Sequence, residues 1–138
     1  MTTAGKELAD KASGMLVFPH VSKAGIGVGV ERGGGALLID GMIVDYYSTT
    51  SGSIGFQLGA EVRRQVILFM NKDALESFRN SSGWEAGVDA SVALATLGAG
   101  GTIDTEIAKE SVIGFIFGNT GLMYNLSFEG TKISKMKK

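Results

Sequence analysis

Glycine is the feature that most constrains this chain. There are 21 glycines among 138 residues, about twice the number that an average usage of about 7% would give. A glycine inside a helix or strand costs about 0.5–1 kcal/mol relative to alanine, because it loses more backbone freedom on folding. The excess glycines are therefore expected at turns, or where a second surface approaches the backbone closely.

Some of these glycines alternate with apolar residues. Between Ala24 and Val30 glycine occupies every second position, which predicts a strand with one smooth face on which another layer packs closely. The stretch is similar to a phosphate-binding loop, but such a loop opens a helix. Here a second cluster, Gly33 to Gly35, follows and predicts the tip of a loop. Dinucleotide binding is therefore not expected.

Turn and cap signals mark several boundaries along the chain. Asp40-Gly41 predicts a two-residue hairpin, because both turn positions require a positive φ. Asn71 predicts the N-cap of a helix that continues to Arg79. Asn119-Thr120-Gly121 predicts the connection of a hairpin, and Thr131 to Met136 is predicted as a last strand.

Apolar patterns predict further strands. Met15 to Phe18 is predicted as a short strand that Pro19 ends, so that His20 lies in a loop. Val66 to Met70 is apolar throughout, as expected of a strand buried on both faces. Trp84 to Leu97 alternates and is predicted as one strand.

These patterns together predict an α+β fold that is mainly antiparallel β. We expect a curled sheet, forming a sandwich or a partial barrel, with about two short helices packed on it. The second helix is expected over Thr2 to Ser13. The length is that of one domain, and no linker composition divides the chain, so residues 1–138 are predicted to form a single domain.

The composition excludes several classes of site. The chain has no cysteine and one histidine, so disulfides and thiolate metal sites are excluded and a zinc site is not expected. The net charge of −1 argues against a nucleic-acid partner, which usually needs a strongly basic domain. No cofactor is expected. Met1 to Leu16 lacks a signal-peptide pattern, and no apolar run is long enough to span a bilayer.

Catalysis is not expected, although one set of carboxylates is left open. The sequence contains no G-x-S-x-G element around a nucleophilic serine. Asp89, Asp104 and Glu106 lie near small residues and would suit hydrolysis if two of them met in space. Solvated charges and turn caps are the alternative explanation for these residues.

Two segments leave a binding role open. Ser48 to Ser53 is rich in hydroxyl groups, which suit a polar headgroup or a sugar, although an exposed strand end and turn has the same composition. Trp84 is the only tryptophan. Its indole suits a membrane interface, while a core anchor is the alternative.

The strongest electrostatic feature is the C-terminus. The last seven residues contain four lysines, which are Lys132, Lys135, Lys137 and Lys138. Near an anionic membrane each lysine contributes about 1 kcal/mol, so this tail predicts weak, salt-sensitive attachment that needs a second contact. Candidates for that contact are Lys23, Arg63 and Arg64. A solvated terminus without a role is the alternative.

A series of short motifs runs in order through the chain from about Lys11 onward. They are Gly14-Met-Leu-Val-Phe-Pro19, Ala24-Gly-Ile-Gly-Val-Gly29, Gly35-Ala-Leu-Leu38, Tyr46-Tyr-Ser-Thr-Thr-Ser-Gly-Ser53, Gly55-Phe-Gln-Leu-Gly59, Phe78-Arg-Asn-Ser-Ser-Gly-Trp84, Gly87-Val-Asp-Ala90 and Gly121-Leu-Met123. Taken together, these motifs resemble the SYLF domain family.

The resemblance implies a lipid-binding module without a defined catalytic set. Eukaryotic members bind phosphoinositides, and some also bind and bundle actin, whereas bacterial members are typically exported single-domain proteins or lipoproteins. The chain is similar to the bacterial kind. We therefore expect an exported, non-enzymatic domain that binds anionic phospholipid headgroups at a membrane surface. A protein-interaction module, of the actin-binding kind, or an envelope structural protein is the alternative.

Overall fold

The computed structural model describes residues 10–24, 30–51, 63–95, 109–118, 121–123 and 131–136. These residues contain one helix, α3 (Lys72–Asn80), and the strands β1 (Gly14–Ala24), β2 (Val30–Ile39), β3 (Met42–Ser51), β4 (Arg63–Phe69), β5 (Trp84–Glu85), β6 (Ala93–Leu94), β7 (Val112–Gly118), β8 (Gly121–Met123) and β9 (Lys132–Lys135).

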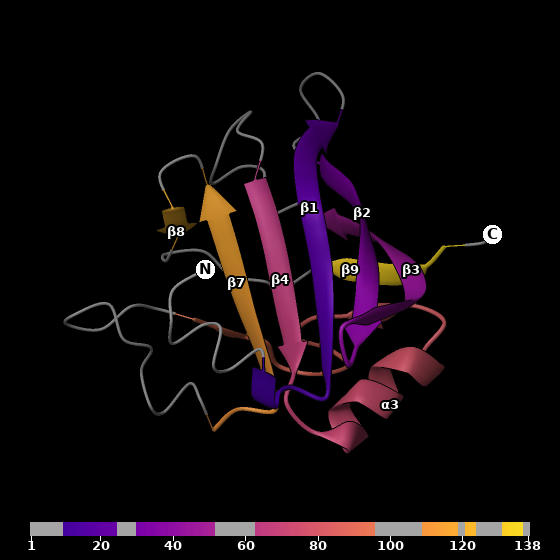
Figure 1. Cartoon of the computed structure of the whole chain (residues 1–138). Coiled ribbons are helices and arrows are strands. Elements are labelled where there is room, and N and C mark those ends of the chain that lie inside the picture. The colour runs from indigo at the N-terminus through magenta and orange to yellow at the C-terminus, as the bar shows by residue number, and fades with distance from the viewer. Residues whose placement is uncertain are drawn as a thin grey trace.

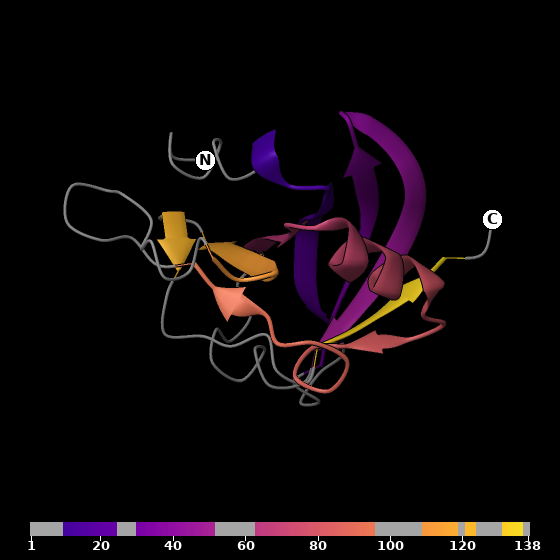
Figure 2. The ribbon, with the colours of Figure 1, turned by 90° about the horizontal axis from the view of Figure 1, so that it is seen from below.

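The strands form one nine-stranded sheet. Its order is β5-β9-β3-β2-β1-β4-β7-β6, and β8 pairs with β7. Apart from the parallel contact of β6 with β7, the pairings between the described strands are antiparallel. The sheet curls into a half-barrel, as the view from below shows (Figure 2). The predicted class, α+β with a curled and mainly antiparallel sheet, is confirmed.

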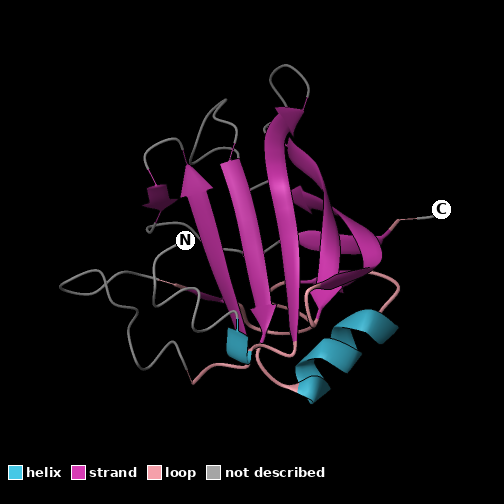
Figure 3. Ribbon diagram, in the orientation of Figure 1, coloured by secondary structure: helices cyan, strands magenta, loops and turns pink. Residues whose placement is uncertain are grey.

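Within the described residues the helix content is lower than predicted. Helix α3 lies at the lower end of the sheet (Figures 1 and 3), and it begins where the Asn71 signal predicts. The Ala74 N–H donates to the Asn71 side-chain oxygen at 2.8 Å. The second predicted helix, over Thr2 to Ser13, is not supported: among its described residues only Asp10 and Lys11 are helical. Residues 2–9 lie outside the described part of the chain.

Strand β1 is longer than its sequence suggests. The predictions that Pro19 ends the strand and that His20 lies in a loop are both wrong, because β1 continues to Ala24. Its register with β2 shifts between Val17 and His20. Proline lacks the N–H that a central strand needs, and an irregularity of this β-bulge type accommodates it.

Strand β2 corrects the prediction of a glycine loop. Gly33 to Gly35 form no loop tip but lie within β2, paired with β1 on one side and β3 on the other. A Cβ at Gly35 would collide with the carbonyl oxygen of Val17 and with the ring of Phe18. Glycine is therefore required at this position by close packing, not by a turn.

Two further strand predictions are also wrong in their extent. Ala24 and Val30 are antiparallel partners, so they belong to two strands and not to one; residues 25–29 lie outside the described part. The predicted strand from Trp84 to Leu97 is instead the two short strands β5 and β6. The chain turns between them at Gly87, which has a φ of 90°.

Other predictions are confirmed. Asp40 and Gly41 have φ values of 53° and 78°, as the predicted hairpin turn requires. Strand β4 is buried on both faces through Val66 to Phe69. The C-terminal hairpin pairs β7 with β8, and the predicted last strand corresponds to β9.

The two faces of the sheet carry separate apolar clusters. The inner face, defined here as the one against which α3 packs, holds an aromatic group of Tyr47, Phe69, Phe78 and Trp84. The ring centroids of Phe69 and Phe78 lie 4.6 Å apart. The outer face carries a second cluster over β4 and β7. Trp84 is thus a core anchor, and its membrane-interface alternative is not supported.

Candidate functional site

Basic residues gather at the end of the sheet away from α3. The register places Arg32, Thr50 and Lys132 side by side on β2, β3 and β9. Arg63 on β4 lies one row away, as the partner of Val21. Lys23 lies one row away on the other side, opposite Glu31. We call the positions of Lys23, Arg32, Arg63 and Lys132 the basic end.

Alternation along β9 decides which face each of its residues takes. Ile133 is buried in the inner cluster. Because side chains alternate along a strand, Lys132 and Ser134 occupy outer-face positions. The Lys132 side chain is 70% exposed, more than those of Arg79 and Lys135.

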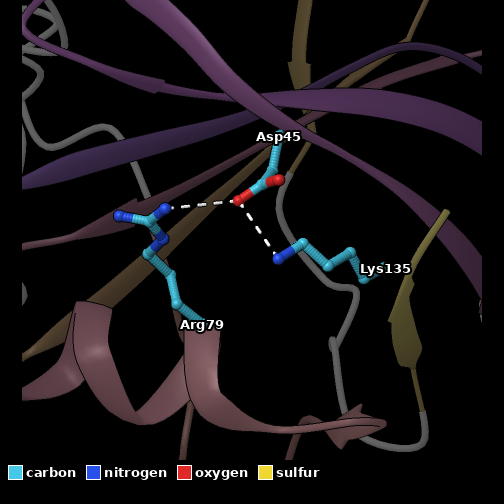
Figure 4. Close-up of polar contacts among 3 residues, drawn as sticks. All are labelled: Asp45, Arg79 and Lys135. Atoms are coloured by element: carbon cyan, nitrogen blue, oxygen red, sulfur yellow. Dashed lines mark hydrogen bonds and ion pairs between the residues drawn. The ribbon is translucent and has the colours of Figure 1, made fainter. Parts of the chain in front are cut away.

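The two described lysines of the tail have different partners. The Lys135 ammonium lies 3.4 Å from an Asp45 carboxylate oxygen, and the Arg79 guanidinium of α3 lies 3.3 Å from the same oxygen (Figure 4). The Asp45 side chain is only 15% exposed. Its carboxylate joins β3 to Lys135 on β9 and to Arg79 on α3. Lys132 lies 3.6 Å from Glu85. A pair this exposed contributes about 0–1 kcal/mol and exchanges readily.

The structure gives less information on the other predicted cations. Arg64 is exposed on β4, which lies two strands beyond β2 in the sheet order. For Lys23 and Arg63 the structure gives backbone positions, and both belong to the basic end. Lys137 and Lys138 lie outside the described residues. The structure thus brings Lys23, Arg63 and Lys132 to one end and keeps Lys135 apart from them.

An apolar groove runs along the outer face of β2. Gly34 and Ala36 form its floor, Val17 and Tyr46 line it from β1 and β3, and Leu38 and Met136 complete the lining; its volume is about 450 Å³. We call this the outer groove. Val17, Ala36 and Tyr46 stand in one register row, so a small residue separates two larger ones. No charged side chain lines it.

The outer face becomes more polar toward the basic end. Gly34, at the end of the groove nearest the basic end, pairs with Ser48, and Ser48 pairs with Ser134. Both serines are exposed. The next outer row holds Arg32 and Lys132. Along this face apolar, hydroxyl and cationic rows therefore follow one another.

Among the described residues, burial shifts the pKa of the Tyr47 phenol. Burial raises the pKa of the Tyr47 phenol above its usual value; the Asp45 carboxylate adds to the increase, and Arg79 opposes it. The Tyr47 hydroxyl is buried and has no hydrogen-bond partner among the described residues. Its position beneath α3 makes it part of the core and not of the basic end.

Of the three carboxylates considered for hydrolysis, only Asp89 belongs to the described part of the chain. Asp89 accepts a hydrogen bond from the Glu85 N–H at 2.6 Å, so it stabilises the turn after β5. Asp104 and Glu106 lie outside the described residues. Within the described ranges, no group of three His, Cys, Asp or Glu side chains could hold a metal ion. Those ranges also contain no helix long and apolar enough to cross a bilayer.

Sequence reasoning missed Arg32 and the outer groove. Both omissions follow from placing Gly33 to Gly35 in a loop, which removes β2 from the centre of the sheet. The available signal was the alternation that continues from Gly34 through Ala36 and Leu38. These small residues form a groove only when larger side chains lie beside them on the two neighbouring strands.

The comparisons place the chain in a family. No curated protein matches the chain. Residues 50–138 match the family Ysc84, described as "Las17-binding protein actin regulator". The match covers more than half of the chain and includes β4 to β9, whereas β1 and β2 precede it. This chain therefore belongs to the Ysc84 (SYLF) family of lipid-binding and actin-regulating domains.

Proposed function

We propose that this chain is a non-catalytic domain that binds anionic phospholipid headgroups, of the phosphoinositide kind, at a membrane surface. The observation that carries the proposal is the exposed Lys132 in a row with Arg32, at an end of the sheet that also holds Lys23 and Arg63. The family's lipid-binding character supports it. The extracytoplasmic location expected from the family resemblance is part of the same proposal.

The electrostatic attraction is modest and must be shared among several cations. A basic residue near an anionic surface contributes about 1 kcal/mol. The Lys132–Glu85 pair is weak enough for a phosphate to compete with the carboxylate. Lys135 contributes less, because Asp45 already compensates its charge.

Exposed apolar side chains supply the second contact that weak electrostatic binding needs. Tyr46 is 48% exposed and Met136 47% exposed, and both lie on the outer face beside Ser48 and Ser134. Large apolar side chains beside a basic patch suit the boundary between headgroups and acyl chains. Lys132 and these apolar side chains therefore lie on the same face of the sheet.

Liposome co-sedimentation tests the proposal with a matched pair of variants. Lys132→Gln should weaken binding to phosphatidylserine-containing vesicles about five-fold, which corresponds to about 1 kcal/mol. Lys135→Gln removes the same charge from the same strand, but it should change binding less than about two-fold, because its ammonium is held by Asp45. Added salt should weaken the wild type, and phosphatidylcholine vesicles should not bind.

Equal effects of the two substitutions would contradict the assignment of the cationic contact to Lys132. Binding that is indifferent to salt would contradict the electrostatic mechanism as a whole. A third variant, Lys137→Gln with Lys138→Gln, measures what the last two lysines add.

The family description supports a second candidate, a protein-interaction module with actin as its partner. Co-sedimentation with purified actin filaments tests this directly. Filament binding by both wild type and Lys132→Gln, together with no vesicle binding, would replace the membrane proposal with this one.

A further inference from the structure

We infer that the outer groove binds one acyl chain of an anionic phospholipid, with the phosphate at the rows of Ser48 and Lys132. The inference rests on the proposed function and goes beyond it, since it names a site for the tail of the lipid. It also rests on β1 and β2, which precede the region matched to the family.

The lining of the groove selects an aliphatic ligand. Gly34 and Ala36 on the floor, with Val17 and Leu38 beside them, offer no side-chain hydrogen-bond donor or acceptor. A polar ligand would lose its hydration there without replacement, which costs free energy. An alkyl chain has no hydrogen bonds to lose and gains from leaving water.

The width of the groove selects a single chain. Val17 and Tyr46 stand on strands separated by β2, so their backbones are about 10 Å apart at about 4.8 Å per strand spacing. The two side chains fill part of that distance. An α-helix with side chains is about 10–12 Å wide and does not fit between them. One row of methylene groups does fit.

The volume agrees with a ligand of this size. The groove encloses about 450 Å³, within the range of about 300–1,000 Å³ typical of small-molecule sites. A dimer interface would need far more buried surface than this groove offers, about 800 Å² on each partner.

The order of polarity fixes the orientation of the lipid. Leu38 lies at the end of the groove away from the basic end, beside Asp10 and Asp40, and Gly34 lies toward the basic end. From Gly34 the next outer positions are Ser48 and Ser134, followed by Lys132. A phosphate beyond Gly34 therefore meets hydroxyl groups and a cation instead of carboxylates, while its acyl chain lies along β2.

Calorimetric titration with monomeric lysophosphatidylglycerol, which has one acyl chain and one phosphate, tests the inference. A Cβ at Gly34 would meet no atom within 4 Å, so Gly34→Leu can fill the groove without displacing neighbours. We expect this variant to bind the lysolipid at least ten-fold more weakly than the wild type. Ser77→Leu, which adds the same side chain to the exposed face of α3, should bind it like the wild type.

A second variant covers the case in which Gly34→Leu fails to fold. Tyr46→Ser removes one wall of the groove at a half-exposed position and should weaken lysolipid binding several-fold. Glycerophosphoglycerol, which keeps the singly charged phosphodiester headgroup but has no acyl chain, should bind much more weakly than the lysolipid to the wild type.

The outcomes separate this inference from the proposed function. Salt-sensitive vesicle binding that depends on Lys132, with lysolipid binding unaffected by Gly34→Leu and Tyr46→Ser, overturns the groove and leaves the membrane proposal standing. Absence of binding to both vesicles and lysolipid overturns both. A wild-type dimer that Gly34→Leu converts to a monomer in sedimentation would assign the groove to self-association and also overturn the inference.

Discussion

Adjacent residues on β2 and β3 differ sharply in packing, because their side-chain positions lie on opposite faces of the sheet. On β3 the Tyr47 ring is 1% exposed and its centroid lies 4.7 Å from that of Phe78, whereas Tyr46 is 48% exposed and lines the outer groove. On β2 a Cβ at Gly35 would collide with Phe18, whereas one at Gly34 would meet nothing within 4 Å.

This comparison teaches that one strand can serve two purposes at once. The period of two along a strand sends neighbouring side chains to opposite faces. Inner positions of β2 and β3 pack in the core of the fold, and outer positions line the groove. Substitutions on the two faces should therefore separate stability from binding.

The largest difference in the free energy of unfolding is expected between substitutions of a core aromatic residue and of an exposed apolar residue. Phe78→Ala should lower the free energy of unfolding by about 3–5 kcal/mol, because it opens a cavity among Tyr47, Phe69 and Trp84. That is a large part of the about 5–15 kcal/mol typical of a domain. Met42→Ala, at a 70% exposed side chain, should change it by less than about 0.5 kcal/mol.

Urea unfolding followed by Trp84 fluorescence measures both variants. If Phe78→Ala proved as stable as Met42→Ala, the inner face would not be the main source of stability and the comparison would be broken.

The next largest difference in stability is expected between substitutions of the adjacent glycines Gly34 and Gly35. Gly35→Ala should destabilise by about 1–3 kcal/mol, since backbone as well as side-chain atoms must move to admit the methyl group. Gly34→Ala should be neutral or stabilising by up to about 1 kcal/mol, because alanine loses less backbone freedom in a strand. Thermal unfolding of the two variants checks this, and similar losses at both positions would refute the close-packing argument for Gly35.

The smallest difference in stability is expected between substitutions of Tyr46 and Tyr47, and this difference depends on pH. The pKa of Tyr47 is raised in the folded protein above the unfolded value of about 10. The folded state then holds this proton more tightly, so the stabilisation is present below about pH 10 and is lost as pH rises toward the folded pKa. Tyr47→Phe removes this loss and also an unpartnered buried hydroxyl, so it should be neutral or slightly stabilising near neutral pH.

Urea unfolding at neutral and alkaline pH measures the effect. Tyr46→Phe is the control and should keep the alkaline loss of stability of the wild type. An alkaline loss in Tyr47→Phe as steep as in the wild type would show that Tyr47 does not carry this pH dependence.

The sequence by itself determined the local features of this protein. Asp40-Gly41 determined a hairpin because its turn requires positive φ, Asn71 determined a helix start through its side-chain acceptor, and the apolar run from Val66 determined a strand buried on both faces. Each of these signals acts within a few residues, so no distant neighbour is needed to interpret it. The motifs that resemble the SYLF family are likewise local, and the match over residues 50–138 confirmed the family.

Only the tertiary structure decided which residues, distant in the sequence, become neighbours. Gly33 to Gly35 have the composition of a loop, and it is the approach of Phe18 to Gly35 that explains glycine within a strand. Lys132 and Lys135 are equivalent in sequence, yet strand pairing places one in a row with Arg32 and the other beside a shielded Asp45 carboxylate. Contacts of this kind join residues far apart in the chain. They depend on register and curvature, which no short segment of sequence encodes.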